Sequence, residues 1–88
     1  MATGTAGSSL QSELNRLNGV TTPSSMRDAA GAANVYAGTT GRDLIAALNI
    51  KASGSRQPNA FKGLNAVCNE IAGTTDNSAT DALRSISV

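Results

Sequence analysis

The 88 residues carry seven Lys plus Arg against six Asp plus Glu, which is the length and charge of one small, nearly neutral domain. This length excludes a multidomain enzyme. A net charge of +1, with one Tyr and one Phe, gives neither a basic stripe for phosphates nor an aromatic platform for stacked bases, so nucleic acid is not an expected partner. With no His and a single Cys, we expect no catalytic residue, cofactor or metal site.

Small side chains dominate the composition, because Ala, Ser, Gly and Thr make up 43 of the 88 residues. A core rich in Ala buries little apolar area, and ordering each residue costs about 1 to 2 kcal/mol of backbone entropy. We therefore expect a marginally stable domain that is helped by a partner. No stretch approaches the roughly 20 apolar residues of a membrane span, so no membrane partner is expected.

The first nine residues differ in composition from the rest of the chain. Met1–Ser9 contains Gly, Ser, Thr and Ala but no large apolar side chain after Met1. We predict a flexible arm over residues 1–9 that becomes ordered on a partner, followed by one folded domain over residues 10–88. The arm is the expected contact region, through Ala2, Thr3, Gly4, Thr5 and Ala6.

The first two helices are predicted from apolar spacing and from start and stop signals. Leu10, Leu14 and Leu17 recur on one helix face, so a first helix is expected over about residues 9–18. Pro23 is tolerated in a first helical turn, and Ser25 with Asp28 has the spacing of a capping box. These signals predict a second helix over about residues 24–37, and Gly38 ends it.

Three further helices follow by the same signals. Thr40 with Asp43 has the spacing of another capping box, which predicts a third helix that runs to Ala52. Pro58 is expected to open the fourth helix, which Gly73 ends. Its predicted apolar face is Phe61, Leu64, Val67, Cys68 and Ile71. Ser78 with Asp81 begins a short fifth helix, and no segment alternates with the period of a strand, so the fold class is all-α.

The chain also contains an internal repeat, because residues 23–48 can be laid on residues 58–83 at an offset of 35. Eight of the 26 aligned positions are identical. We interpret the domain as two tandem helical hairpins that share the third helix and are closed by the fifth.

Both copies share the signature Asn-x-x-Ala-Gly-Thr-Thr, and degenerate versions begin at Asn15 and Asn49. Its residues are Asn34, Gly38, Thr39 and Thr40 in one copy, and Asn69, Gly73, Thr74 and Thr75 in the other. Each Asn is expected to bind unpaired helix carbonyls or an adjacent loop, and each second Thr to cap the next helix. The alternative is a ligand site built from repeated Asn side chains.

Several other residues admit a chemical role. Cys68 is a candidate nucleophile, but no His can serve as its base, and its position on a core-facing surface favours a buried side chain. Asp28, Asp43 and Asp81 are candidates for acid and base catalysis, but helix capping explains each of them. Tyr36 and Phe61 are candidates for packing or for contact with a partner.

The strings at residues 30–41, 43–52 and 64–75 resemble the short Ala-Gly-Thr-Thr helical modules of tailed-bacteriophage virion proteins, which are commonest in phages of actinobacteria. The resemblance implies a non-enzymatic minor capsid or decoration protein that binds and stabilises the capsid shell. The implied partners are the major capsid protein of the same phage and copies of this chain, with no small-molecule substrate. The implied location is the capsid of a virion assembled in the host cytoplasm.

Two alternatives to a shell protein stay open. One is a tail or head-to-tail component of the virion. The other is a non-virion helical adaptor that binds a protein partner in a groove between its helices.

Overall fold

The computed structural model describes residues 9–54 and 56–87, and none of them lies in a β-strand. The predicted all-α class is confirmed. The helices are α1 (Leu10–Leu17), a 3₁₀ turn (Pro23–Ser25), α2 (Ala29–Ala37), α3 (Leu44–Ala52), α4 (Leu64–Ala72) and α5 (Ala79–Arg84). The arm predicted over residues 1–9 lies outside the described residues, except for Ser9, which is the N-cap of α1.

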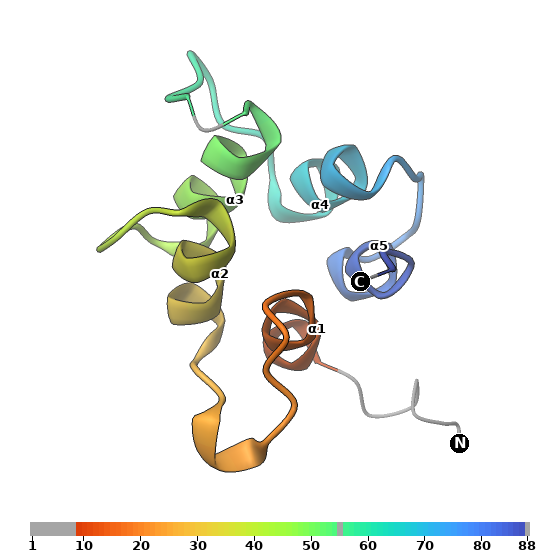
Figure 1. The fold of residues 1–88 in the computed structure, drawn as a ribbon. Helices are drawn as coiled ribbons and strands as arrows, with labels where there is room; N and C mark the ends of the chain where they lie inside the picture. Colours follow the sequence, from red (N-terminus) through yellow and green to blue (C-terminus); the bar gives the residue numbers. More distant parts are fainter. Residues whose placement is uncertain (1–8, 55, 88) are drawn as a thin grey trace.

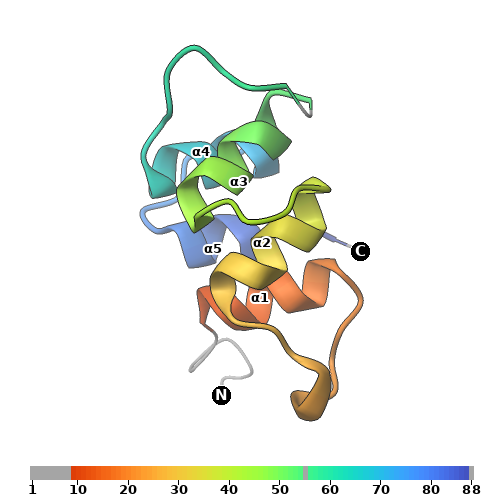
Figure 2. The same cartoon turned by 90° about the vertical axis from the view of Figure 1, so that its left-hand side faces the viewer.

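The five helices form a closed ring (Figure 1). Each helix packs against the next one along the chain, and α5 packs against α1. Figure 2 shows that α1, α2 and α3 begin on the same side of the molecule, so the connections after α1 and α2 return the chain to that side. The unit that repeats is therefore one helix with its following connection, and each 35-residue copy holds two such units.

Every helix contributes two adjacent residues to the core, at the fourth and fifth positions after its N-cap. The fifth-position residues are fully buried, and they are Leu14, Ala33, Leu48, Cys68 and Leu83. The fourth-position residues are buried as well, and they are Glu13, Ala32, Ala47, Val67 and Ala82. Burying a large aliphatic side chain contributes roughly 1.5 to 3 kcal/mol, so most of the apolar stabilisation comes from the few Leu and Val side chains.

Two predicted helix starts are wrong in the same way. The second helix begins at Ala29 and not near Ser24, because the Asp28 carboxylate is itself the N-cap and accepts a 2.7 Å hydrogen bond from the Gly31 amide. Asp43 likewise caps α3 and accepts from the Ala46 amide at 2.7 Å. A carboxylate at the N-cap binds free amides and complements the helix dipole, so neither Ser25 nor Thr40 begins a helix.

The predicted start of the fourth helix at Pro58 is also wrong. Residues 53–63 form a connection, and α4 begins at Leu64 with Gly63 as its N-cap. Phe61 therefore lies outside the helix and is 46 % exposed, and it does not belong to the apolar face of α4. The predicted start at Ser78 is confirmed, because its hydroxyl accepts from the Asp81 amide.

One Asn on each of α1 to α4 holds the chain just before the next helix. It lies six residues after the N-cap, and its amide nitrogen donates both to the carbonyl one turn earlier and to a carbonyl of the following connection. Its side-chain oxygen accepts from the amide of that same connection residue. The four pairs are Asn15 with Arg27, Asn34 with Arg42, Asn49 with Lys62, and Asn69 with Asp76. We call this arrangement the Asn clamp.

The Gly and Thr residues of the shared signature shape the chain around the clamp. Gly38 and Gly73 adopt the left-handed conformation (φ 75° and 73°), which only Gly adopts without a steric penalty, and the predicted helix ends are confirmed. The first Thr of each copy, Thr39 or Thr74, donates its hydroxyl to the clamp Asn at 2.7 Å. The prediction that the second Thr caps the next helix is wrong, because the caps after Thr40 and Thr75 are Asp43 and Ser78.

The Asn clamp predicts a large effect of removing one buried Asn. In Asn49→Ala, the amide and carbonyl of Lys62 lose partners at 2.8 and 3.0 Å, so the free energy of unfolding should fall by about 2 to 3 kcal/mol. Urea denaturation followed by circular dichroism measures this change. Asn59→Ala, on the exposed connection, is the matched control and should change stability by less than about 0.5 kcal/mol. Equal effects of the two substitutions would contradict the clamp.

Candidate functional site

The side chains of Asn34 and Asn69 have no hydrogen-bonding capacity left for a ligand. The amide nitrogen of Asn34 donates to the carbonyls of Ala30 and Arg42, and its oxygen accepts from the Arg42 amide and the Thr39 hydroxyl. Asn69 makes the equivalent four bonds. Two donors and two acceptors are the full capacity of a carboxamide. The hydrogen bonds of these two Asn side chains are therefore all used within the fold, which favours a structural role over a ligand site built from repeated Asn side chains.

Charged side chains close the ring between α1 and α5. Arg16 donates to the Glu13 carboxylate and to the carbonyls of Leu83 and Ile86, all at 2.9 Å. Arg84 approaches the second Glu13 oxygen at 3.9 Å. This cluster is not among the predicted sites, although Glu13 stands where the other helices have Ala or Val.

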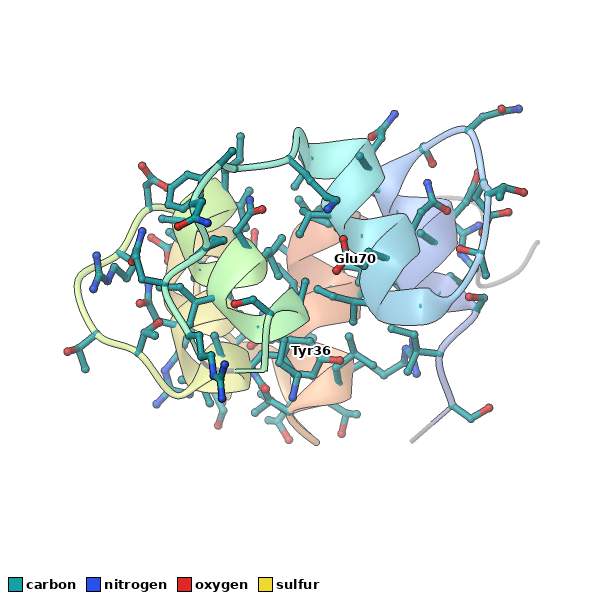
Figure 3. The ribbon with its side chains drawn as sticks, turned by 90° about the horizontal axis from the view of Figure 1, so that it is seen from above. Tyr36 and Glu70 are labelled. Atoms are coloured by element: carbon teal, nitrogen blue, oxygen red, sulfur yellow. The ribbon has the colours of Figure 1, made fainter. Side chains whose placement is uncertain are left out.

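Tyr36 packs against the core near the end of α3 (Figure 3). The ammonium of Lys51, in the last turn of α3, lies 4.6 Å from the centre of the Tyr36 ring, a cation–π contact. The pKa of Tyr36 is raised, first by burial and then by Cys68, and the positive charge of Arg16 lowers it in part. Tyr36 is thus a half-buried side chain at the edge of the core.

Phe61 and Ile45 are two large apolar residues that stay exposed on neighbouring segments of the fold. The Asn49 amide nitrogen binds the carbonyls of Ile45 at 2.9 Å and Lys62 at 3.0 Å, which brings the backbone of Ile45 close to the residue that follows Phe61. The side chains of Ile45 and Phe61 are 38 % and 46 % exposed. We call these two residues the α3–α4 apolar pair.

An exposed ion pair joins the connection before α4 to α4 itself. The Lys62 ammonium is 3.0 Å from the Glu70 carboxylate, and Figure 3 shows Glu70 on the side of α4 that faces α3. Both side chains are well exposed, so the pair contributes little to stability. Lys62, which carries the positive charge of this pair, directly follows Phe61 in the chain.

The predicted site residues therefore do not gather in one place. Tyr36 is on α2, with its ring against the end of α3, whereas Phe61 precedes the start of α4. Ala2, Thr3, Gly4, Thr5 and Ala6 lie outside the described residues. Asp28 and Asp43 act as helix caps, and Asp81 is 2.5 Å from Arg84.

The part of the chain that the structure describes contains no cavity and no group of three or more potential metal-ligating side chains. Within the same residues, no helix has both the length and the apolar character that crossing a membrane requires. No known family model, curated protein or solved structure matches the chain.

Cys68 is the most strongly perturbed titratable group. Its side chain is fully buried on α4, as predicted, and burial raises the pKa of its thiol from 9.0 to about 11. A buried thiol with a raised pKa stays protonated at neutral pH and is a poor nucleophile. The geometry therefore favours the packing role of Cys68.

This pKa shift predicts how stability depends on pH. The folded thiol holds its proton more tightly than the unfolded one, so this contribution to stability is complete below pH 9 and is lost as pH rises towards 11. The difference between the folded and unfolded pKa of this thiol corresponds to a fall of roughly 2 to 3 kcal/mol in the free energy of unfolding. Denaturation at several pH values between about 7 and 11 measures this fall. The Cys68→Ala variant carries the residue found at the equivalent position of the first copy, Ala33. In this variant the free energy of unfolding should fall less with rising pH, and the part that remains comes from Tyr36, whose pKa is also raised. The same fall in both proteins would contradict the assignment.

Proposed function

We propose that this protein is a non-enzymatic structural component of a tailed-phage virion, of the minor capsid or decoration type, which binds the major capsid protein and stabilises the shell. The proposal rests on the sequence resemblance and on one structural observation. That observation is the exposure of two large apolar residues, Ile45 and Phe61, on segments whose backbones are linked through the buried Asn49.

The clamp makes the α3–α4 apolar pair suitable as a contact point. Lys62 is fixed through both its amide and its carbonyl, so the neighbouring Phe61 backbone is already ordered before any partner binds. Binding through a preorganised side chain avoids part of the entropy that ordering a loop would cost. An exposed aromatic anchor beside a charged pair is also the residue pattern of a small interface with a polar rim.

Two side chains give a weak contact, and a capsid supplies many copies of it. Repeated binding sites on a shell raise the effective concentration of each further contact, so a small protein can be retained without a large interface. The mechanism that we propose is multivalent bracing of neighbouring capsid subunits. In this mechanism the ring of helices is the spacer between capsid subunits, and the α3–α4 apolar pair makes the contact.

The first experiment counts copies of this chain in purified virions by quantitative mass spectrometry, relative to the major capsid protein. A near-stoichiometric ratio supports the shell protein. A ring of about six or twelve copies supports the tail or head-to-tail alternative instead. Absence from the particle overturns the virion role and favours the helical adaptor.

Particles that lack this protein allow the contact residues to be tested by adding it back. Phe61→Ser should lower occupancy on the particle at least tenfold, because it removes the exposed anchor without touching the Asn clamp. Val35→Ser is the matched control, because Val35 on α2 is also 46 % exposed, and its occupancy should match the unsubstituted chain. Equal occupancy of the two variants would count against the α3–α4 apolar pair.

The predicted arm is tested in the same particles. Deleting residues 2–8 leaves Ser9 in place as the N-cap of α1, so the helical signal should be unchanged. Lower occupancy of this shortened chain is expected if the arm contacts the shell. Unchanged occupancy would remove the arm from the proposed contact region and leave the α3–α4 apolar pair to account for binding.

A further inference from the structure

The contact between α5 and α1 is built differently from the other four contacts of the ring. An Asn clamp secures each connection from α1 through to α5, and this Asn lies six residues after the N-cap of its helix. The sixth residue after Ser78, the N-cap of α5, is Arg84. The clamp is thus replaced by a charged side chain at the helix that completes the ring.

Charge and carbonyl contacts hold the end of α5. The Arg16 guanidinium binds the carbonyls of Leu83 and Ile86, and these bonds cap the last turn of α5. The same guanidinium pairs with Glu13, which is only 5 % exposed. A buried carboxylate is tolerated only while its positive partners are in place, so ring closure depends on Arg16.

The apolar contribution of α5 is small. Its buried side chains are Leu83 and two Ala residues, Ala79 and Ala82. The helix has six residues, and an isolated helix needs about 12 to 15 residues to be even marginally stable in water. The start of α5 is tied to α4 through exposed Asn65, which accepts from the Ala79 amide. Helix α5 packs more extensively on α4 than on α1, so the contacts of Arg16 with Leu83 and Ile86 are the main polar hold on its far end.

We propose that α5 acts as a latch of the ring. The whole of α5 detaches from the ring while α1 to α4 stay folded. Arg16 is the residue that keeps α5 attached. Opening removes α5 from the faces of α1 and α4 that it covers, and it is a step separate from unfolding of the clamped helices.

Native-state hydrogen exchange measured by NMR on the full chain tests this directly. Three amides report on α5: Ala82, bonded to Ser78; Ser85, bonded to Asp81; and Ile86, bonded to Leu83. After correction for intrinsic rates, all three should exchange at least tenfold faster than the Ala47 amide of α3 and the Val67 amide of α4. Rapid exchange of Ser85 and Ile86 with a slow Ala82 would indicate fraying of the helix end and would overturn the latch. Equal rates at all five amides would overturn it too.

Variants separate the latch from general destabilisation. Arg16→Met keeps much of the side-chain stem but removes the guanidinium, so the α5 amides should exchange at least tenfold faster still, relative to Ala47 and Val67. Lys62→Met is the matched control, because it removes an exposed ion pair between the preceding connection and α4, and this ratio should not change. If Arg16→Met does not fold, Glu13→Gln removes one charge at constant size and should raise the same ratio. An unchanged ratio in the variant that folds would overturn the role of the charged cluster.

Discussion

The hydrogen bonds of one Asn per helix determine where the next helix begins. A carboxamide has two donors and two acceptors, so it can satisfy a helix carbonyl and both main-chain groups of a connection residue at once. In this chain it does so at the same distance from the N-cap in four successive helices. The connections differ in length, yet each is fixed at the residue that precedes or nearly precedes the following cap. Helix order and spacing therefore follow from polar side chains more than from the apolar core.

This arrangement explains how a chain so rich in small residues keeps a defined fold. The fully buried apolar residues of the fourth and fifth positions include only three Leu and one Val, and the others are Ala or Cys, so apolar burial alone specifies the packing only weakly. Buried polar groups are costly when they lack partners, and that cost penalises any arrangement in which the clamps are not formed. The Asn clamps thus supply specificity where the core supplies limited stability.

The sequence predicts the parts of the fold that depend on neighbours along the chain. The helix stops at Gly38 and Gly73, the burial of Cys68 and the contact of Asn34 with the adjacent loop are all local, and each is confirmed. Helix starts were harder, because several cap candidates precede α2 and α3, and the Asp residues bind the free amides in place of Ser25 and Thr40. Phe61 was misassigned because Pro58 is compatible with both a helix start and an extended connection.

Ring closure could not be predicted from local pattern. Arg16 and the carbonyls that it binds are separated by about 70 residues, and no periodicity links them. The one available signal was a departure from the repeat, because Glu13 and Arg84 stand at positions where the other units have an apolar residue and an Asn. In a repeat of short helices, such departures mark the place where the first and last units meet, since a buried charge persists only where another unit supplies its partner. The same reasoning separates two kinds of surface on this protein: charged departures close the ring, whereas Ile45 and Phe61 stay 38 % and 46 % exposed, and the contact with a neighbour that we propose lies there.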